Sequence, residues 1–379
     1  MSDRIIVGMS GGVDSSVAAA LLVEQGHDVV GVTLKVWPWK ESSDPTTKFG
    51  SCCSPEAVDD ARQVARKLGI PYYLLNSERE FDSTVISNFT REYLAGRTPV
   101  PCVVCNQKVK FGSLLHRALA WEANAVATGH YARLEADPVT GRILLRKAKD
   151  SRRDQTDFLW TLTQAQLRHA CFPVGGLAKE EVRAKARSLG LGVADKPESQ
   201  EICFIPDNDY RGFLRRRDPC GFRPGPIVDR NGRILGAHQG LSAYTIGQRR
   251  GLGLSTGEPL YVVALKPESN TIVVGGTEEL EATALRATRV NFILFDQLDR
   301  ELRVDAKIRH NHIPARATLR PSGDGEVMVE FDEPQRAITP GQSVVFYQGD
   351  LVVGGGIIAL ERSSGKKGPA GNSRKSEST

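Results

Sequence analysis

The feature that most constrains this chain is a glycine-rich segment, Gly8-Met-Ser-Gly-Gly-Val-Asp-Ser15, that connects an apolar strand pattern to a helical one. The strand pattern covers 4–9, and the helical pattern covers 15–25 before Gly26. Glycines let the backbone turn sharply and approach a ligand, and the N–H groups at the start of the helix then form an anion site. A Walker loop would carry a lysine beside its last serine, and this segment has none. We therefore predict an α/β fold with a phosphate-binding turn that is less suited to γ-phosphoryl transfer.

The first 135 residues alternate between strand and helix patterns, which predicts a doubly wound, parallel sheet covered by helices. Besides the first strand, we expect strands at 28–34, 72–75 and 125–128. Helices are expected at 55–68, 81–95, 111–123 and 179–189. The helix at 55–68 has the clearest limits, because Ser54 and Pro55 favour its start and Gly69 favours its end.

The rest of the chain divides into further units. We expect the α/β domain to cover 1–206, although the stretch 136–155 is crowded with Lys and Arg and has no clear period. Residues 207–283 are rich in Gly, Pro and Arg, which suggests a small irregular domain. Short β-rich runs over 284–362 predict a C-terminal antiparallel β-barrel. Residues 363–379 lack aromatic and large aliphatic side chains, and we expect a disordered tail there.

Composition narrows the class of protein. The 379 residues are 40% hydrophobic and 25% charged, which is ordinary for a globular protein. The net charge of +5 permits a polyanionic partner without demanding one. The longest apolar run, Val17–Val23, is far shorter than the roughly 20 residues of a membrane-spanning helix. The start of the chain lacks the apolar core of an export signal, so we expect no membrane partner, a cytoplasmic location and reduced cysteines.

Two cysteine segments are candidate reactive sites. Cys102 and Cys105 lie in a proline-braced segment that we expect to be a loop before a helix, with Lys108 and Lys110 close behind. A helix N-terminus and nearby cations would lower a thiol pKa and raise its thiolate fraction. Cys203 lies in the second segment. A structural zinc site would need four suitably spaced ligands, which the chain does not show, whereas three thiols with one open position could hold an iron–sulfur cluster.

Several motifs together resemble a known family. Ser10–Ser15 resembles the SGGxDS signature (the PP-loop) of the ATP pyrophosphatases, whose fold is of the adenine nucleotide alpha-hydrolase type. The full set closely resembles the tRNA-specific 2-thiouridylase family over about residues 4–360. The other motifs of that set are Cys52–Ala57, Pro101–Phe111, Ala127–Ala132, Asp154–Leu159, Ser199–Phe204, Gly247–Leu252 and Pro340–Gln342.

The resemblance implies an ATP-dependent reaction on tRNA. ATP would adenylate the C2 oxygen of the wobble uridine, pyrophosphate would leave, and a sulfur nucleophile would then displace AMP to give 2-thiouridine. Cys203 is implied as the carrier of a persulfide received from an upstream sulfur donor, a cysteine desulfurase or a sulfur-relay protein. Cys105 is implied as its partner thiol, and Mg²⁺ is expected to be held mainly through the phosphates.

The resemblance also implies binding residues. Those for ATP are Gly8, Met9, Ser10, Gly11, Gly12, Val13, Asp14, Ser15, Leu34 and Gly129. Those near the target base are Val100, Pro101 and Cys102. Those for tRNA are His130, Arg153, Asp154, Gln155, Arg309, His310 and Gln342. The basic stretch Arg142–Arg153 and the run Arg215–Arg217 are further candidates for phosphate contacts, with an ordinary solvated surface as the competing interpretation. For His130 the competing interpretation is a hydrogen-bonded core histidine at a strand end.

One position departs from part of the family. Three residues before the first catalytic cysteine some members carry an Asp suited to proton transfer near the base, and this chain has Cys102 there. A second mechanism is therefore open, in which a [4Fe–4S] cluster on Cys102, Cys105 and Cys203 binds hydrosulfide at its open iron. Two competing functions also stay open: a different PP-loop adenylating enzyme that modifies tRNA, and a non-catalytic RNA-binding or iron–sulfur scaffold.

Overall fold

The computed structural model describes residues 2–38, 54–197, 202–205, 207–255, 257–323 and 325–359. The N-terminal unit is built on a five-stranded sheet in the order β3-β2-β1-β4-β7, and every neighbouring pair is parallel. Its strands are β1 (Arg4–Gly8), β2 (Asp28–Lys35), β3 (Tyr72–Asn76), β4 (Ala125–Thr128) and β7 (Ala170–Cys171). The chain adds strands on one side of β1 and then on the other, so the carboxyl ends of β1 and β4 form the topological switch point.

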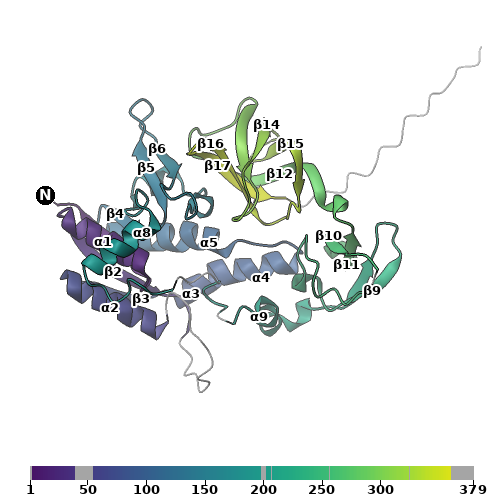
Figure 1. The fold of residues 1–379 in the computed structure, drawn as a ribbon, viewed down its shortest axis with the longest axis horizontal. Helices are drawn as coiled ribbons and strands as arrows, with labels where there is room; N and C mark the ends of the chain where they lie inside the picture. The colour runs from purple at the N-terminus through teal and green to yellow at the C-terminus, as the bar shows by residue number, and fades with distance from the viewer. Residues whose placement is uncertain are drawn as a thin grey trace, which may run out of the picture.

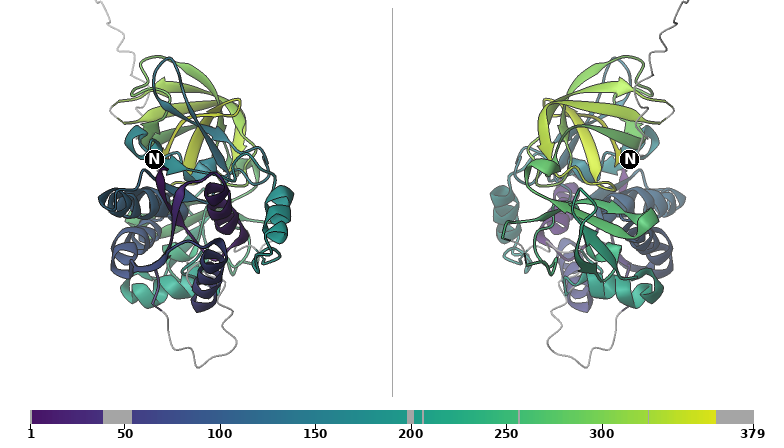
Figure 2. Two further views of the ribbon diagram at one scale, coloured as in Figure 1. Left: turned by 90° about the vertical axis from the view of Figure 1, so that its left-hand side faces the viewer. Right: turned by 90° about the vertical axis from the view of Figure 1, so that its right-hand side faces the viewer.

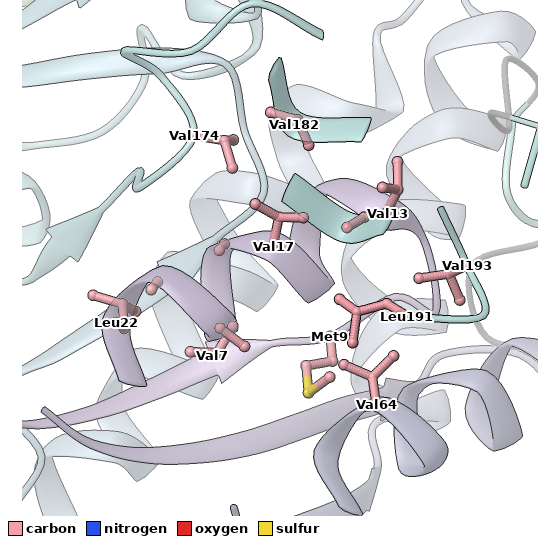
Figure 3. Packing of buried hydrophobic residues seen from close by; sticks show 14 of the residues in the cluster. Val7, Met9, Val13, Val17, Leu22, Val64, Val174, Val182, Leu191 and Val193 are labelled. Atoms are coloured by element: carbon pink, nitrogen blue, oxygen red, sulfur yellow. The ribbon is translucent and has the colours of Figure 1, made fainter. Parts of the chain in front are cut away.

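Helices α1 (Val13–Glu24), α2 (Pro55–Leu68) and α8 (Lys179–Ser188) pack beside this sheet (Figure 1). The predicted limits of α2 are confirmed: the Ser54 side chain accepts a hydrogen bond from the Ala57 N–H at 3.2 Å, Pro55 is the first helical residue, and Gly69 ends the helix. Valines of α1 and α8 meet those of β1 in one apolar cluster (Figure 3). The buried cluster anchors the start of α1 directly after the glycine-rich turn.

A second helical layer carries the Cys102–Cys105 segment. One helical run contains α3 (Glu78–Phe81), a π-helical part η1 (Asp82–Ile86) and α4 (Ser87–Leu94). The other contains α5 (Pro101–Val104), a π-helical part η2 (Cys105–Leu114) and α6 (Leu115–Ala120). The prediction that Cys102 and Cys105 lie in a loop is therefore wrong. The helix begins ten residues earlier than expected, because Pro101 occupies its first position, where the missing N–H costs nothing.

The central unit is more regular than its composition suggests. It has α9 (Tyr210–Arg217) and a four-stranded sheet in the order β10-β11-β8-β9. The strands are β8 (Gly225–Val228), β9 (Ile234–His238), β10 (Tyr261–Lys266) and β11 (Thr271–Gly275). Phe213 and Leu214 of α9 pack into an apolar cluster with Phe89 and Tyr93 of α4, which attaches this unit to the second helical layer.

The predicted C-terminal barrel is confirmed. Its strands are β12 (Glu281–Phe292), β13 (Leu302–Lys307), β14 (Ala315–Pro321), β15 (Val327–Arg336), β16 (Ser343–Gln348) and β17 (Leu351–Ile358). All pairings are antiparallel, and β12 closes the barrel by pairing with both β15 and β17. The sequence patterns missed β12. Strand β17 contains three consecutive glycines, Gly354–Gly356. Those glycines let the strand lie close to its neighbours: a Cβ on Gly355 would stand 2.7 Å from the ring of Trp160.

We expected the basic stretch at 136–155 to be irregular, but it contains the strand β6 (Ile143–Lys147). This strand forms a hairpin with β5 (Ala132–Ala136). This hairpin extends the barrel sheet, because β6 pairs with β17. The side views show the barrel lying over both the parallel-sheet unit and the central unit (Figure 2). Within the described part of the chain, no helix is long and apolar enough to cross a membrane.

The barrel and the N-terminal unit share a hydrophobic core. Tyr347 and Val352 of the barrel pack with Phe111 and Trp160 of the N-terminal unit. Trp160 is 1% exposed, and its Nε1–H donates to the Ser343 hydroxyl at 3.0 Å. The barrel is thus fixed to the first unit by buried side chains, and its loops are held in place above the second helical layer.

We predict that Trp160→Ala lowers the free energy of unfolding by about 3–5 kcal/mol, because it removes a large side chain from this shared core. Trp121 is the matched control, since it is 40% exposed and its replacement by Ala should cost less than about 1 kcal/mol. Equilibrium unfolding in urea measures both. Equal losses for the two variants would contradict the shared core.

Candidate functional site

The glycine-rich turn lies at the switch point of the parallel sheet. Gly12 precedes the first residue of α1, so the N–H groups of the first helical turn point out of the carboxyl end of the sheet. Gly11 has φ +70°, and a Cβ there would stand 2.1 Å from the Ala57 carbonyl oxygen. A Cβ on Gly129, directly after β4, would stand 2.5 Å from the Ser15 nitrogen. The backbones of two strands and two helices therefore meet here at distances that side chains would prevent.

The hydroxyl groups of the turn hold its shape. The Ser15 hydroxyl accepts from the Ser10 N–H at 3.1 Å and donates to the Gly12 carbonyl at 3.2 Å. The Ser16 hydroxyl donates to the same carbonyl at 2.9 Å. Met9 is buried, and its carbonyl accepts from the Thr33 hydroxyl on β2 at 2.6 Å. Leu34 follows Thr33 at the carboxyl end of β2, so the residues expected to contact ATP lie along one edge of the sheet.

Two lysines reach the turn from far along the chain. The Lys179 ammonium, at the start of α8, lies 2.8 Å from both carboxylate oxygens of Asp14. Asp14 also accepts a hydrogen bond from the Tyr131 hydroxyl at 2.7 Å. Lys196 donates to the Gly11 carbonyl at 3.2 Å and to Asp60 at 2.5 Å. The turn has no lysine of its own, and both lysines come from elements more than 160 residues further along the chain. Spacing in the sequence therefore could not predict their position.

This arrangement fits the phosphates of a nucleotide. Backbone N–H groups at a helix N-terminus favour anions, and the close backbone packing at Gly11 and Gly129 leaves no side chain over the turn. The Asp14 carboxylate would repel phosphate, but Lys179 neutralises it, and only 5% of the Lys179 side chain is exposed. The arrangement is therefore suited to the binding and orientation of a polyphosphate at the carboxyl end of β1.

Cys105 and Cys203 border the same apolar cluster. Cys105 begins η2, and Cys203 lies in the short described segment 202–205. Both are partly buried and pack against a cluster that includes Phe81, Phe89 and Phe204. The structure thus brings to one cluster two cysteines that are 98 residues apart. Cys52, Cys53 and the 199–201 part of the second cysteine motif lie outside the described residues.

Cys102 differs from the expectation for the cysteine segment. Its side chain is exposed. Even so, the pKa of the Cys102 thiol is raised, because the surrounding protein limits its hydration; Lys110 opposes this shift and Asp157 adds to it. The expected fall in thiol pKa is therefore wrong for Cys102, since desolvation outweighs the cations. Among the described residues, no group of three His, Cys, Asp or Glu side chains is placed to hold a metal ion.

The expected tRNA residues of the barrel contact three different segments of the chain. Gln342 donates to the Thr98 carbonyl at 2.9 Å, and the Pro340 carbonyl accepts from the Thr98 N–H at 2.8 Å. These contacts fix the segment that leads through Val100 and Pro101 to Cys102. His310 lies 2.9 Å from Asp157, whereas Arg309 is exposed and donates to the Arg336 carbonyl at 3.0 Å.

The expected tRNA residues of the N-terminal unit have different surroundings. His130 accepts or donates a 2.7 Å hydrogen bond at the Thr128 hydroxyl, and burial lowers the pKa of its imidazole well below the usual value. Asp154 is buried and accepts from the Ala148 N–H at 3.0 Å, while burial raises its pKa. Gln155 accepts from the Tyr131 N–H at 2.9 Å. Arg153 is exposed. Asp154 and Gln155 therefore hold the segment in place, and Arg153 faces solvent.

Most cations of the two basic stretches contact the protein itself. Arg146 pairs with Glu135 and Asp350, and Arg142 pairs with Asp296. Within the run 215–217, Arg217 pairs with Asp82 at 2.5 Å. These pairs stabilise the hairpin and α9, which explains why the density of arginine in the sequence overstates the charge open to a nucleic acid.

We predict that Lys179→Met weakens ATP binding by about tenfold and lowers the free energy of unfolding by about 1–3 kcal/mol, because Asp14 loses the cation that neutralises it. Lys185 of the same helix is the control: it pairs with Glu24 at 2.7 Å near the surface, and its replacement by Met should cost under about 1 kcal/mol. Calorimetric titration with ATP and thermal unfolding measure the two effects. Unchanged ATP affinity in Lys179→Met would show that the Lys179–Asp14 pair does not prepare the turn for phosphate.

Comparisons with known proteins cover all three units. The family model described as the tRNA methyl transferase HUP domain matches residues 3–207. The tRNA methyl transferase PRC-barrel domain matches 212–276, and the aminomethyltransferase beta-barrel domain matches 282–358.

Relatives that match nearly the whole of this chain carry the same protein name. The tRNA-specific 2-thiouridylase MnmA of Acetivibrio thermocellus is 53% identical over 94% of this chain and 99% of its own length. That of Heliobacterium modesticaldum is 54% identical over 94% of this chain and 93% of its own. Among solved structures, NMN synthetase from Francisella tularensis has a TM-score of 0.34 at 17% identity, covering 57% of this chain and 77% of that one.

Proposed function

The chain belongs to the tRNA-specific 2-thiouridylase (MnmA) family, and on that premise we propose that it uses ATP to replace the C2 oxygen of the wobble uridine of tRNA by sulfur. The observation that carries this proposal is more than 50% identity to thiouridylases over 94% of the chain, a span that includes the phosphate turn, the cysteine helix and the barrel. All three family models have descriptions that mention a methyltransferase, whereas the names of these longer relatives describe thiolation.

The first chemical step is activation of the base. A carbonyl oxygen is a poor leaving group, so the C2 oxygen attacks the α-phosphate of ATP, the bond to the β-phosphate breaks, and pyrophosphate departs with its electron pair. The turn from Gly8 to Ser15 binds the leaving pyrophosphate through backbone N–H groups. Mg²⁺ accompanies the phosphates as part of the nucleotide substrate. Leu34 and Gly129 border the nucleotide at the ends of β2 and β4.

The second step transfers sulfur. Cys203 receives a persulfide from an upstream donor, a cysteine desulfurase or a sulfur-relay protein. The outer sulfur attacks C2, the C2–O bond breaks, and AMP leaves with that oxygen. The Cys105 thiolate then attacks Cys203 and releases the thiolated base with formation of a Cys105–Cys203 disulfide, which an external thiol must reduce. In a second order of events, Cys105 releases hydrosulfide first and hydrosulfide attacks C2. The shared apolar cluster of the two cysteines supports either order.

A cluster mechanism competes with the persulfide for the sulfur step. It would use Cys102, Cys105 and Cys203 as ligands of a [4Fe–4S] cluster and hydrosulfide as the nucleophile. Activation by ATP is the same in both mechanisms. Anaerobic purification separates them: an iron-free, colourless protein with full activity supports the persulfide, and activity that follows iron content supports the cluster.

The tRNA substrate is held on the side of the molecule where the barrel meets the cysteine helix. The target uridine must leave the anticodon stack so that its C2 can reach both ATP and sulfur. Val100, Pro101 and Cys102 border the base in this proposal. The residues that would contact the tRNA are His130, Arg153, Asp154, Gln155, Arg309, His310 and Gln342. We place this reaction in the cytoplasm, where thiols stay reduced.

We predict that Cys203→Ala abolishes formation of 2-thiouridine, by at least about a thousandfold, while pyrophosphate release in the presence of tRNA continues. The reason is that adenylation precedes the step that needs sulfur. Cys220→Ala is the control, because Cys220 is an exposed cysteine outside the shared cluster. Mass spectrometry of tRNA nucleosides and a pyrophosphate assay give the two readouts.

Normal thiolation in Cys203→Ala would remove the persulfide assignment. A wild-type protein that releases no pyrophosphate with tRNA and ATP would instead favour the non-catalytic scaffold, and release without 2-thiouridine would favour a different PP-loop tRNA-modifying enzyme.

A further inference from the structure

A buried carboxylate lies where the barrel meets the N-terminal unit. Asp157 belongs to the short helix η3 (Thr156–Phe158), and its side chain is 5% exposed. One carboxylate oxygen, Oδ2, lies 2.9 Å from the His310 Nδ1 and 3.4 Å from the Lys307 Nζ. The other, Oδ1, is buried and has no hydrogen-bond partner among the described residues. Burying a carboxylate oxygen in that position costs free energy, because its hydration is lost without replacement. Such an oxygen therefore calls for an explanation.

The ring of His310 connects this carboxylate to the surface. About half of the His310 side chain is exposed (49%), in contrast to Asp157. Its ring also packs on the ring of Phe158 with centroids 4.7 Å apart. When Nδ1–H donates to the carboxylate, the neutral imidazole has Nε2 as a proton acceptor on its other side. The geometry is that of a carboxylate which fixes the orientation and tautomer of an imidazole.

The pair lies beside the residues expected to border the target base. Helix α5, which carries Pro101 and Cys102, packs against η3. In η2, which continues α5, the Asn106 amide donates to the Phe158 carbonyl of η3 at 3.0 Å and joins the two helical segments. The charge of Asp157 is close enough to act on the Cys102 thiol. The barrel brings His310 to the same place, so the imidazole, the carboxylate and Cys102 come from three separate parts of the chain.

The proposed reaction needs a proton acceptor at this place. When the C2 oxygen of uridine bonds to the α-phosphate, the ring keeps its charge neutral only if N3 loses its proton, since C2 then forms a double bond to N3. After sulfur replaces the oxygen, N3 takes a proton back.

We propose that His310 accepts the N3 proton of the target uridine during adenylation and returns it after sulfur transfer, and that Asp157 is the positioning residue that holds the imidazole for this task. The inference rests on the proposed function. Each bond change is balanced: N3–H breaks as the O2–phosphorus bond forms and pyrophosphate leaves. N3–H forms again when the Cys105 thiolate breaks the S–S bond to the base, or as AMP leaves when hydrosulfide is the nucleophile. No oxidant or reductant is involved in this proton transfer.

Other charged groups surround the pair and must be considered in any test by pH. Lys307 lies against Asp157, and Asp154 and Tyr347 lie within the same buried region. Lys147 stands over the Tyr347 ring at 4.1 Å. These groups also join the barrel to the N-terminal unit. A purely structural role of Asp157, as an anchor for the barrel, is therefore the competing explanation.

The decisive variant is Asp157→Asn, which keeps the shape and an acceptor oxygen but removes the charge. We expect the rate of tRNA-dependent pyrophosphate release to fall about 10- to 100-fold at neutral pH, with tRNA affinity changed less than about twofold. In His310→Ala, we expect a similar loss of rate and a pH profile that differs from that of the wild type. Added imidazole should restore part of the His310→Ala activity.

Two control variants distinguish a role of Asp157 in positioning His310 from a role in anchoring the barrel. Asp350→Asn breaks the barrel contacts to Arg133 and Arg146, each at 2.7 Å, away from the cysteine helix. It should change thermal stability without changing the pH profile. The double variant Asp157→Asn with Lys307→Met avoids an uncompensated buried ammonium, and it should fold like the wild type yet stay slow.

The outcomes are distinct. Wild-type rates in Asp157→Asn across the pH range, or loss of rate only in proportion to unfolded protein, would overturn the inference. Failure of imidazole to restore His310→Ala, together with an unchanged pH profile, would overturn it as well. A wild-type protein that produced no 2-thiouridine would contradict the proposed function itself. That result is distinguishable from a failure of the role proposed for His310, because it does not depend on the variants.

Discussion

The close approach of Gly129 to the first turn of α1 is the constraint on which the rest of the site depends. A Cβ at Gly129 would stand 2.5 Å from the Ser15 nitrogen, so β4 reaches the phosphate turn only because that side chain is absent. The apolar cluster beneath α1 then fixes the direction of the helix. With both in place, Lys179 and Lys196 reach the turn from α8 and from the segment that follows it. The anion site is thus assembled by packing rather than by a local motif.

The chemistry beyond ATP depends on a second constraint, the core that the barrel shares with the N-terminal unit. Trp160 and Tyr347 hold the two together, and the contacts of Thr98 with Pro340 and Gln342 fix the approach to the cysteine helix. The target base would therefore meet groups from both units. In the proposed mechanism, phosphate binding, sulfur transfer and proton transfer would fall to different elements that only the folded chain brings together.

The sequence predicted what is locally encoded. The parallel sheet, the limits of α2 and the barrel follow from periodicity and from residues such as Ser54, Pro55 and Gly69. It did not predict the start of the cysteine helix at Pro101 or the π-helical part that follows it. It also did not predict the strand β12 or the hairpin β5–β6, because these elements depend on pairing with distant segments. The Lys179–Asp14 and His310–Asp157 pairs were missed for the same reason, since their partners are 165 and 153 residues apart. The roles proposed for Cys105 and Cys203 come from family motifs, whereas the structure shows that both pack against one apolar cluster.

The central claim is that ATP activates the C2 oxygen itself and that AMP carries this oxygen away. A tRNA with ¹⁸O at C2 of the wobble uridine tests this most directly. Single-turnover reaction with ATP and a sulfur donor should give one ¹⁸O in AMP for each 2-thiouridine formed, with none in pyrophosphate. Unlabelled AMP formed together with 2-thiouridine would contradict the account.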